Sequence, residues 1–379
     1  MMKTATNPLP PELPITRIRI ADCRVPLPRE IKLSATRITT RDYTCLRIET
    51  ADGTAGEAIG YTRGTPLAAM LEACGRRLLG GDAIMRNALM AGLVQTNQPG
   101  RANLSRALSL VDIALWDIGA KQAGLPLYRL LGGLRRAVPA TAVGGYYLDT
   151  LGRDAIVRDA AALRDSGYQR IKLMLLGDDA AFDHDLVAAM MRGAPGRLAA
   201  DAHWSWRGVT EAVRACRMLD DFGLEFIEDP FSAVDAGLMA ELGKRIRTPL
   251  AAGEDIYGTR ILSTLASVVD VLRVDATAGG GITGAIAAIT HADGFGKIVF
   301  PHVFLPLHVH LAAAYEAIES VEMIAVSTGA DPLEKVLRIA PRVVDGMAIV
   351  GEEPGVGLAI DWEAVERTAA RAITLEPES

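Results

Sequence analysis

Apolar and polar residues alternate near the beginning of the chain, and this alternation predicts strands. It runs through residues 15–27 and 42–53, the second of which ends in an Asp-Gly turn, and a third short run covers residues 57–62. Residues 65–81 change to a helical period and end in a pair of glycines, which is typical of a helix C-terminus. The chain therefore begins with a small sheet followed by helices.

A longer helical period follows in residues 105–133. Five apolar side chains recur there at helical spacing, and we expect them to form a buried side: Leu108, Val111, Ala114, Leu115 and Ile118. The sheet and these helices predict an α+β domain over residues 15–135. Residues 1–14 are rich in proline and are predicted to be a loose tail.

The pattern changes after Pro139. Short apolar runs that end in polar residues alternate with helical stretches, at residues 140–145, 168–175, 196–204, 224–230, 248–255, 268–276, 296–304 and 321–326. Strands that alternate with helices at this spacing predict an α/β fold with a parallel sheet. Eight such runs favour a closed barrel, which we place at residues 136–340.

Residues 341–379 break this rhythm. They contain several turn signals and a final helical stretch. We expect this segment to return to the N-terminal domain.

The composition narrows the class of protein. Half of the residues are hydrophobic and 23% are charged, as in a globular protein with a sizeable core. Forty basic against 46 acidic residues leave a net charge of -6, which argues against a nucleic acid or an anionic membrane as partner. The four cysteines have no metal-type spacing, and no signal peptide or membrane-spanning run is present. We therefore expect a cytoplasmic protein.

Ionisable residues occupy the predicted strand ends. They are Lys172, Asp201, His203, Glu228, Glu254, Asp275, His302 and Glu322. In an α/β barrel the carboxyl ends of the strands meet at one mouth, where active sites form. So many carboxylates repel one another unless a cation offsets the charge, and oxygen ligands without a thiolate favour Mg²⁺. Asp229 and Asp255 directly follow two of these acids, and strand alternation is expected to point them the other way.

A set of longer motifs surrounds these residues. They are VDIALWDIGAKQAGLPLYRLLGG at 111–133, DAHW at 201–204, IEDP at 227–230, GED at 253–255, RVDATAGGGITGA at 273–285 and PHVF at 301–304. Together they resemble the enolase superfamily, mandelate racemase subgroup, from about residue 10 to the end of the chain. The resemblance implies a modified TIM barrel, (β/α)7β, with an N-terminal α+β capping domain, and a homo-oligomer.

The resemblance also implies roles for the strand-end residues. Asp201, Glu228 and Glu254 would bind one Mg²⁺, and Asp275 with His302 would form the base dyad. The substrate would be a small carboxylate whose α-proton is removed, leaving an enediolate. Its negative oxygens would be stabilised by Mg²⁺, by Lys172 and by a protonated Glu322 that donates a hydrogen bond to the substrate carboxylate.

Two departures from the family pattern bear on the reaction. Family members that act on both faces of the α-carbon carry Lys-x-Lys on the second barrel strand, but here Met174 replaces the second lysine. A thioether has no proton to exchange, which counts against a two-base racemase. His203 stands where many members have Asn, and in related acid-sugar dehydratases a histidine there protonates the leaving hydroxyl.

These features favour dehydration of an aldonate or aldarate to a 2-keto-3-deoxy acid. A racemase or epimerase and a cycloisomerase remain alternatives on the same site. A non-catalytic metal-binding relative is a further alternative, although the intact pair of Asp275 and His302 argues against it.

Substrate specificity is expected to come from capping-domain loops at residues 25–34 and 57–66. The polar candidates are Arg29, Lys32, Tyr61 and Arg63, together with Tyr146 and Tyr147 at the end of the first barrel strand. Residues 279–284 satisfy GxGxxG, but position 304 is Phe, so the acid that a dinucleotide site requires is missing. These glycines are expected to bring the sixth loop close to the metal site. His308 and His310 are expected to be structural.

Overall fold

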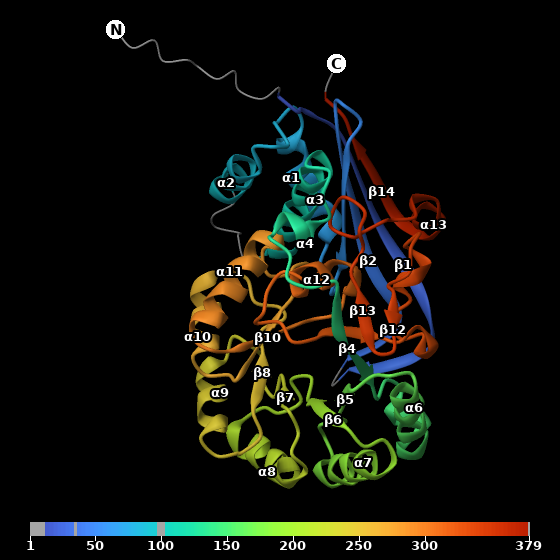
Figure 1. Ribbon diagram of the computed structural model, residues 1–379, viewed down its shortest axis with the longest axis vertical. Coiled ribbons are helices and arrows are strands. Elements are labelled where there is room, and N and C mark those ends of the chain that lie inside the picture. The colour runs from blue at the N-terminus through green and yellow to red at the C-terminus, as the bar shows by residue number, and fades with distance from the viewer. Residues whose placement is uncertain (1–11, 34–35, 97–102, 378–379) are drawn as a thin grey trace.

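The computed structural model describes residues 12–33, 36–96 and 103–377, so most of the predicted N-terminal tail lies outside the described residues. Figure 1 shows two bodies along the long axis of the molecule. The N-terminal sheet and its helices form the upper body, and a ring of strands and helices forms the lower one.

The N-terminal sheet has four antiparallel strands in the order β14-β1-β2-β3. Their bounds are β1 (Ile15–Leu33), β2 (Thr36–Thr50), β3 (Ala55–Tyr61) and β14 (Ala369–Leu375). The first three strands overlap the three predicted ones, and the predicted Asp-Gly turn follows the end of β2. The sequence does not predict β14, because most of its side chains are exposed and show no clear alternation. It follows the expected C-terminal helix, α13 (Trp362–Thr368), and pairs with β1.

Helices cover one face of this sheet. They are α1 (Leu67–Leu78), α2 (Arg86–Thr96), α3 (Ser105–Gln122) and α4 (Leu127–Leu130). The predicted apolar side of α3 is buried: Leu108 and Ile118 are inaccessible to solvent. The helix approaches β3 so closely that a Cβ atom at Gly56 would lie 1.9 Å from the carbonyl oxygen of Ala114. A glycine is therefore required at this crossing.

Eight parallel strands form the lower body. They are β4 (Ala137–Gly144), β5 (Arg170–Met174), β6 (Arg197–Asp201), β7 (Ile227–Glu228), β8 (Leu250–Ala252), β9 (Val271–Val274), β10 (Ile298–Pro301) and β11 (Val321–Ile324). Strands β4 to β10 pair in sequence order, and β11 pairs with β4. A bridge between Val299 and Ile318 joins β10 to the chain just before β11. This arrangement confirms the predicted barrel, with one strand in each of the eight expected runs.

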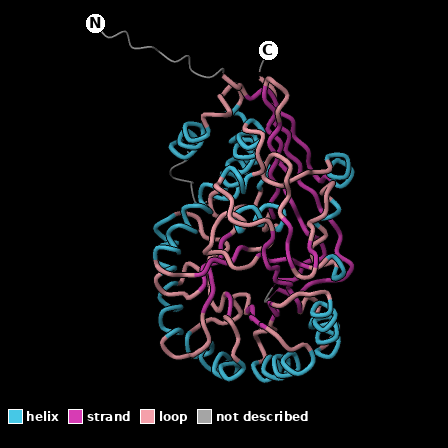
Figure 2. Tube along the Cα trace, in the orientation of Figure 1, coloured by secondary structure: helices cyan, strands magenta, loops and turns pink. Residues whose placement is uncertain are grey.

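Helices surround these strands on the outside, as Figure 2 shows. Their bounds are α5 (Leu148–Leu151), α6 (Arg153–Asp165), α7 (Ala180–Gly193), α8 (Val209–Leu219), α9 (Ala236–Gly243), α10 (Thr259–Ala266), α11 (Gly281–Gly294) and α12 (Leu305–Ala312), with short 3₁₀ turns at η2 (Asp220–Phe222), η3 (Val326–Thr328) and η4 (Leu333–Lys335). A hairpin of β12 (Val343–Val344) and β13 (Met347–Ile349) extends the sheet antiparallel to β4. The boundaries predicted at residues 135 and 340 stay predictions.

The glycine run at residues 279–284 lies where α11 meets α3. Asp112 of α3 accepts hydrogen bonds from the backbone N–H of Thr283 (2.9 Å) and from its hydroxyl (2.7 Å). A Cβ atom at Gly281 would lie 2.2 Å from the Asp112 carboxylate, and its φ is +75°. This differs from the expectation that the run serves the metal site. At Gly281, the lack of a side chain lets a carboxylate from the N-terminal body reach the beginning of α11.

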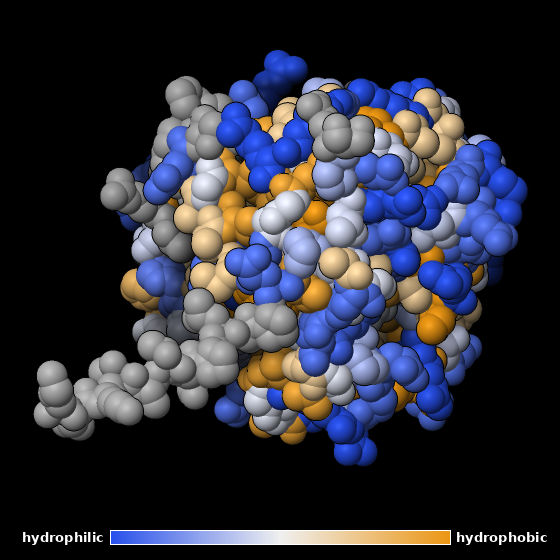
Figure 3. Space-filling model, turned by 90° about the horizontal axis from the view of Figure 1, so that it is seen from above, coloured by the Kyte–Doolittle hydropathy of each residue, from blue (hydrophilic) through white to orange (hydrophobic). Residues whose placement is uncertain are grey.

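On the face seen from above, hydrophobic residues lie in patches among hydrophilic ones (Figure 3). No helix within the described ranges combines the length and apolar character that crossing a bilayer requires.

Candidate active site

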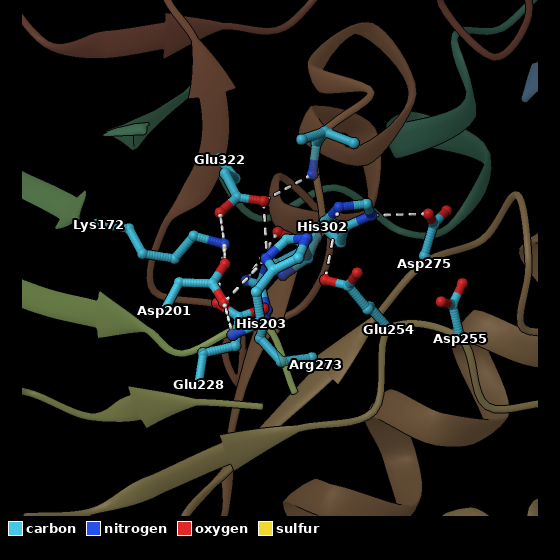
Figure 4. A network of polar contacts seen from close by, with 12 residues as sticks. Lys172, Asp201, His203, Glu228, Glu254, Asp255, Arg273, Asp275, His302 and Glu322 are labelled. Carbon is cyan, nitrogen blue, oxygen red and sulfur yellow. Dashed lines mark hydrogen bonds and ion pairs between the residues drawn. The ribbon is translucent and has the colours of Figure 1, made fainter. Parts of the chain in front are cut away.

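Lys172 extends from β5 into the network of charged side chains, where its ammonium group lies next to carboxylates (Figure 4). Its Nζ atom is 3.0 Å from Asp201 Oδ2, 2.8 Å from Glu228 Oε2 and 2.6 Å from Glu322 Oε1. These side chains extend from β5, β6, β7 and β11. Burial by itself would lower the pKa of Lys172, but the three carboxylates raise it well above its usual value. Lys172 therefore lies in the site as an ammonium ion.

Arg273 is a second buried cation that the sequence reasoning missed. Its Nε atom donates to Glu228 Oε1 (2.6 Å) and its Nη2 atom donates to Glu322 Oε2 (2.8 Å). The side chain is inaccessible to solvent. Arg273 lies two residues before Asp275, so strand alternation puts both on one side of β9. That spacing was the signal available in the sequence.

Glu322 differs from its expected role. It is the second residue of β11 rather than a strand-end residue, and the backbone N–H of Val303 also donates to it (3.0 Å). Burial would raise its pKa, but Arg273 and Lys172 lower it to about 2. In this structure Glu322 is therefore an ionised acceptor and not the protonated donor that was expected.

A cluster of three buried acids lies beside Lys172. Carboxylate oxygens of Glu228, Asp229 and Glu254 come within 4.8 Å of one another. The sequence placed Asp201 in this set and pointed Asp229 away. Asp229 has a φ of +45°, which breaks the strand alternation and turns its side chain inward. Asp201 is held by Lys172 and by the backbone N–H of His203 (3.0 Å).

This cluster fits a divalent cation. Burial, followed by repulsion from neighbouring carboxylates, raises the pKa values of Asp229 and Glu254 well above the usual range. The Oδ1 atom of Asp229 is buried and finds no hydrogen-bond partner among the described residues. Like charges that are held together in this way are stabilised by a cation, and a set of hard oxygen ligands matches Mg²⁺.

His302 and Asp275 form the expected pair. Nδ1 of His302 lies 2.9 Å from Asp275 Oδ2, and Asp275 Oδ1 accepts from the N–H and the hydroxyl of Thr277, each at 2.7 Å. Burial opposes the charge on Asp275, but its contact with His302 lowers its pKa well below the usual value. An ionised carboxylate can only accept, so Nδ1 carries a proton, which leaves Nε2 as the nitrogen that can act as a base. Nε2 is 3.4 Å from Glu254 Oε2.

His308 helps to position this pair, although the sequence analysis expected no role for it beyond a structural one. Its Nδ1 atom donates to the carbonyl oxygen of Val303 (2.7 Å), and its Nε2 atom accepts from the N–H of Ala276 (3.1 Å). Val303 and Ala276 are the residues that follow His302 and Asp275. Burial lowers the pKa of His308, so its ring is neutral. The ring thus connects the two loops that carry the dyad.

His203 and Lys172 contact different oxygens of Asp201: His203 contacts Oδ1 and Lys172 contacts Oδ2. The Nδ1 atom of His203 is 3.2 Å from Asp201 Oδ1, and its ring packs against Trp204 at a centroid distance of 5.0 Å. Its Nε2 atom is buried and has no hydrogen-bond partner in the part of the chain that the structure describes. A φ of +51° turns the side chain toward the mouth. Met174 ends β5, opposite Asp201 in the sheet register.

A cavity of about 740 Å³ lies between the N-terminal body and the barrel mouth. Barrel residues His203, Trp204 and Asp255 line it from one side. From the other side it is lined by β2, β3 and the loop after β3, including Arg41, Tyr61 and Arg63. Arg63 reaches across to Glu254, with Nη2 3.2 Å from Oε1. Both bodies therefore contribute to the site.

The other specificity candidates do not line this cavity, although the Tyr146 ring centroid lies 5.8 Å from the Arg41 guanidinium. Lys32 pairs with Asp178 at 2.9 Å. Arg29, Tyr146 and Tyr147 line a different cavity of about 610 Å³ beside η3 and η4. Of the predicted polar residues of the capping loops, only Tyr61 and Arg63 line the cavity that contains His203.

Comparisons with known proteins agree with this architecture. Residues 15–132 match the family model of the mandelate racemase / muconate lactonizing enzyme N-terminal domain, and residues 155–365 match the enolase C-terminal domain-like model. The L-talarate/galactarate dehydratase of Salmonella typhimurium is 32% identical over 281 residues, which are 71% of this chain and 69% of that protein. The D-galactarolactone cycloisomerase of Agrobacterium fabrum is 29% identical over 93% of this chain and 97% of its own.

A solved structure extends the comparison to three dimensions. The L-talarate dehydratase of Polaromonas sp. JS666, complexed with Mg and L-glucarate, superimposes with a TM-score of 0.87 at 29% identity, covering 97% of this chain and 100% of that one. The fold, the two family models and these relatives lead to one conclusion. The chain belongs to the mandelate racemase / muconate lactonizing enzyme family of the enolase superfamily.

Proposed function

We propose that this protein removes the proton α to a carboxylate of an acid sugar and then eliminates water, giving a 2-keto-3-deoxy acid. The observation that carries the proposal is the pair of imidazoles at one site. Nε2 of His302 is oriented as a base by Asp275, and Nε2 of His203 is unpartnered beside the cavity. A base and an acid are what this elimination requires.

Glu228 and Glu254 would hold Mg²⁺, with Asp201 as the third ligand expected from the family and Asp229 as the acid that the geometry adds. When bound, Mg²⁺ would supply Lewis-acid polarisation of the substrate carboxylate. A test that does not depend on activity is calorimetric titration with Mg²⁺ of Glu228→Gln and Glu254→Gln. Each variant should bind Mg²⁺ at least tenfold more weakly than the parent protein.

His302 would take the α-proton on Nε2, and Asp275 would stabilise the imidazolium that forms. The electron pair of the broken C–H bond moves into the substrate carboxylate and makes an enediolate. Lys172, held as an ammonium ion, would offset part of that negative charge. Met174 cannot exchange a proton at the second-lysine position, so a single base serves one face of the α-carbon.

His203 would complete the reaction. It would give a proton to the hydroxyl on the β-carbon while the C–O bond breaks, so that water leaves and an enol remains. The enol then takes up a proton at the β-carbon and loses the proton of its α-hydroxyl, which gives the 2-keto-3-deoxy acid. Asp201 Oδ1, 3.2 Å from Nδ1, would hold the ring in place for this step.

Cycloisomerisation is the second candidate. It is favoured by the Agrobacterium cycloisomerase, which matches nearly the whole chain, whereas the Salmonella dehydratase matches 71% of it. Such a reaction also needs a single base but leaves the substrate mass unchanged.

Incubation with Mg²⁺ and a panel of aldonic acids, aldaric acids and their lactones separates these candidates. A keto product lighter than its substrate by one water supports dehydration. A product of unchanged mass contradicts it and supports cycloisomerisation. Absence of any product and of any α-proton exchange with ²H₂O would contradict both.

A further inference from the structure

One buried cation of the site, Arg41, forms no ion pair with a described carboxylate, although Asp331 lies near enough to raise its pKa. Lys172, Arg273 and Arg63 each lie within 3.2 Å of a carboxylate oxygen. Arg41 is only 8% exposed, yet no Asp or Glu of the described residues lies within ion-pairing distance of it. Its Nε atom donates to the carbonyl oxygen of Ala330 (2.8 Å), which leaves the terminal nitrogens of the guanidinium free of any such charge.

Arg41 lines the same cavity as His203. Its guanidinium lies 5.4 Å from the ring centroid of Tyr61, and that of Arg63 lies 5.5 Å from it. The Tyr61 ring is in turn 6.4 Å from the ring of His302. Arg41 is therefore on the capping-domain side of the cavity, one aromatic ring away from the proposed base.

The acids near Arg41 are engaged by other residues. Asp331 accepts from the hydroxyl of Tyr43, and Asp42 accepts from that of Thr40 at 2.6 Å. Asp255, on the barrel side of the cavity, pairs with Arg106. Arg41 thus lines the cavity without a direct ion pair to a described carboxylate, with Asp331 nearby as the acid that raises its pKa, whereas the barrel mouth carries the buried acids.

We propose that Arg41 binds a second carboxylate of the substrate, so that the enzyme prefers aldaric acids over aldonic acids. This rests on the proposed function, because it assumes that the first carboxylate lies at Lys172 and the acid cluster. A carboxylate can accept two parallel hydrogen bonds from a guanidinium. An aldonic acid would put a neutral hydroxymethyl group there and leave the desolvated cation unpaired, which is costly.

The test compares matched substrates that differ only at the terminal carbon, such as galactarate with galactonate and glucarate with gluconate. The parent protein should have the higher kcat/KM for the aldarate of a pair. Arg41→Gln should lower kcat/KM for the aldarate on the order of 10- to 100-fold, and for the aldonate by a few-fold at most. Arg41→Lys keeps the charge but loses the fork geometry and should lie between the two.

Arg24→Gln is the matched control. Arg24 lies on the neighbouring strand β1, is exposed and paired with Asp42 at 3.5 Å, and is not among the residues that line this cavity. The preference should be unchanged in this variant. Thermal unfolding and Mg²⁺ titration of Arg41→Gln establish that it is folded. An equal loss on aldarate and aldonate, or an aldonate preference in the parent protein, would overturn the proposal.

Binding without turnover separates this proposal from the proposed function. In His302→Asn, which should not react, aldarate affinity measured by calorimetry should fall when Arg41→Gln is added. If aldarate affinity falls in this way but the parent protein yields no product, the proposed reaction is wrong and the proposed second-carboxylate site is supported. If the parent protein dehydrates aldonates best, the reaction stands and the role of Arg41 is wrong.

Discussion

In the barrel mouth, the effect of substituting a single residue depends on the buried charges that it contacts. Lys172 and Arg273 share the partners Glu228 and Glu322. Lys172 also pairs with Asp201, and Arg273 donates to carbonyl oxygens of β10. Breaking one such pair leaves a buried ion alone, at a cost of about 3–5 kcal/mol. Substitutions in this network therefore change stability as well as chemistry, and tests of catalytic role need readouts that separate the two.

His203→Asn is such a test. It should slow dehydration roughly 100-fold or more, since a positioned general acid contributes about 10²–10⁴-fold. Exchange of the α-proton with ²H₂O, followed by NMR, should change by a few-fold at most, because His302 performs that step. Dehydration at the parent rate would remove His203 from the proposed mechanism.

His308 should influence the reaction rate indirectly, by positioning the dyad of His302 and Asp275. His308→Phe leaves the Ala276 N–H and the Val303 carbonyl without partners and should lower kcat roughly 10- to 100-fold by displacing the loops. The pH profile of kcat/KM should shift, since His302 and Asp275 lose their relative placement. His308→Asn, whose amide can still donate to Val303, should recover part of the rate. A purely structural role would lower the melting temperature and leave the pH profile in place.

At the scale of elements, the contact between α3 and α11 joins the two bodies. Besides Asp112 and Thr283, it includes the Trp116 indole N–H, which donates to the Thr283 hydroxyl (2.9 Å), and the Gly280 N–H, which donates to the Ser109 hydroxyl (2.8 Å). These bonds connect the N-terminal body to the loop that follows Asp275. The contact therefore helps position the dyad.

Gly281→Ala should weaken this contact. The added Cβ would clash with Asp112 at 2.2 Å, and a φ of +75° strains any side chain, so we expect a loss of about 1–3 kcal/mol in the free energy of unfolding. Urea denaturation measures it. Gly294→Ala at the other end of α11, where nothing lies within 4 Å of the new Cβ, is the control. Equal stability of the two variants would contradict this account.

The stability that the contact between α3 and α11 provides should depend on pH. Burial raises the pKa of Asp112 from 3.8 to about 6, although the hydrogen bonds from Thr283 oppose the shift. The folded protein thus holds this proton more tightly than the unfolded chain, and this group's contribution to stability falls as pH rises from about 4 to 6. The Asp112→Asn variant has no carboxyl group at this position, so it lacks this proton-binding site.

Urea unfolding at pH 4 and at pH 7 tests this point. Between these values the stability of Asp112→Asn relative to the parent protein should increase by up to about 3 kcal/mol. Asp293→Asn, on the exposed side of α11, should show no such change. A difference that is independent of pH would mean that Asp112 is ionised throughout.

At the scale of the whole molecule, the site exists only where the two bodies meet. The barrel supplies the acids and histidines, and the capping domain supplies Arg41, Tyr61 and Arg63. The C-terminal strand β14 completes the capping sheet, so both ends of the described chain lie in the same body. Figure 1 shows this return of the chain at the top of the molecule.

Mg²⁺ should stabilise the entire fold. A ligand that binds only the folded state adds about 2.7 kcal/mol at 100 times its Kd, so the thermal unfolding midpoint should rise with Mg²⁺ and fall with EDTA. Glu254→Gln should reduce the rise, because it removes one carboxylate of the cluster. Glu241→Gln, an exposed residue of α9, should keep it. An equal rise in both variants would place the binding elsewhere.

The sequence by itself determined the eight-strand barrel, the N-terminal sheet and the strand ends that carry Lys172, Asp201, Glu228 and His302. Periodicity and chain order are enough for these features, since the carboxyl ends of parallel strands meet at one mouth. Only the tertiary structure revealed the donors that surround Glu322, the inward turn of Asp229, and the contacts of Arg273, His308 and Arg41. The physical reason is that the state of a buried ionisable group depends on neighbours far away in sequence, and Arg41 has none of opposite charge within ion-pairing distance in the described residues.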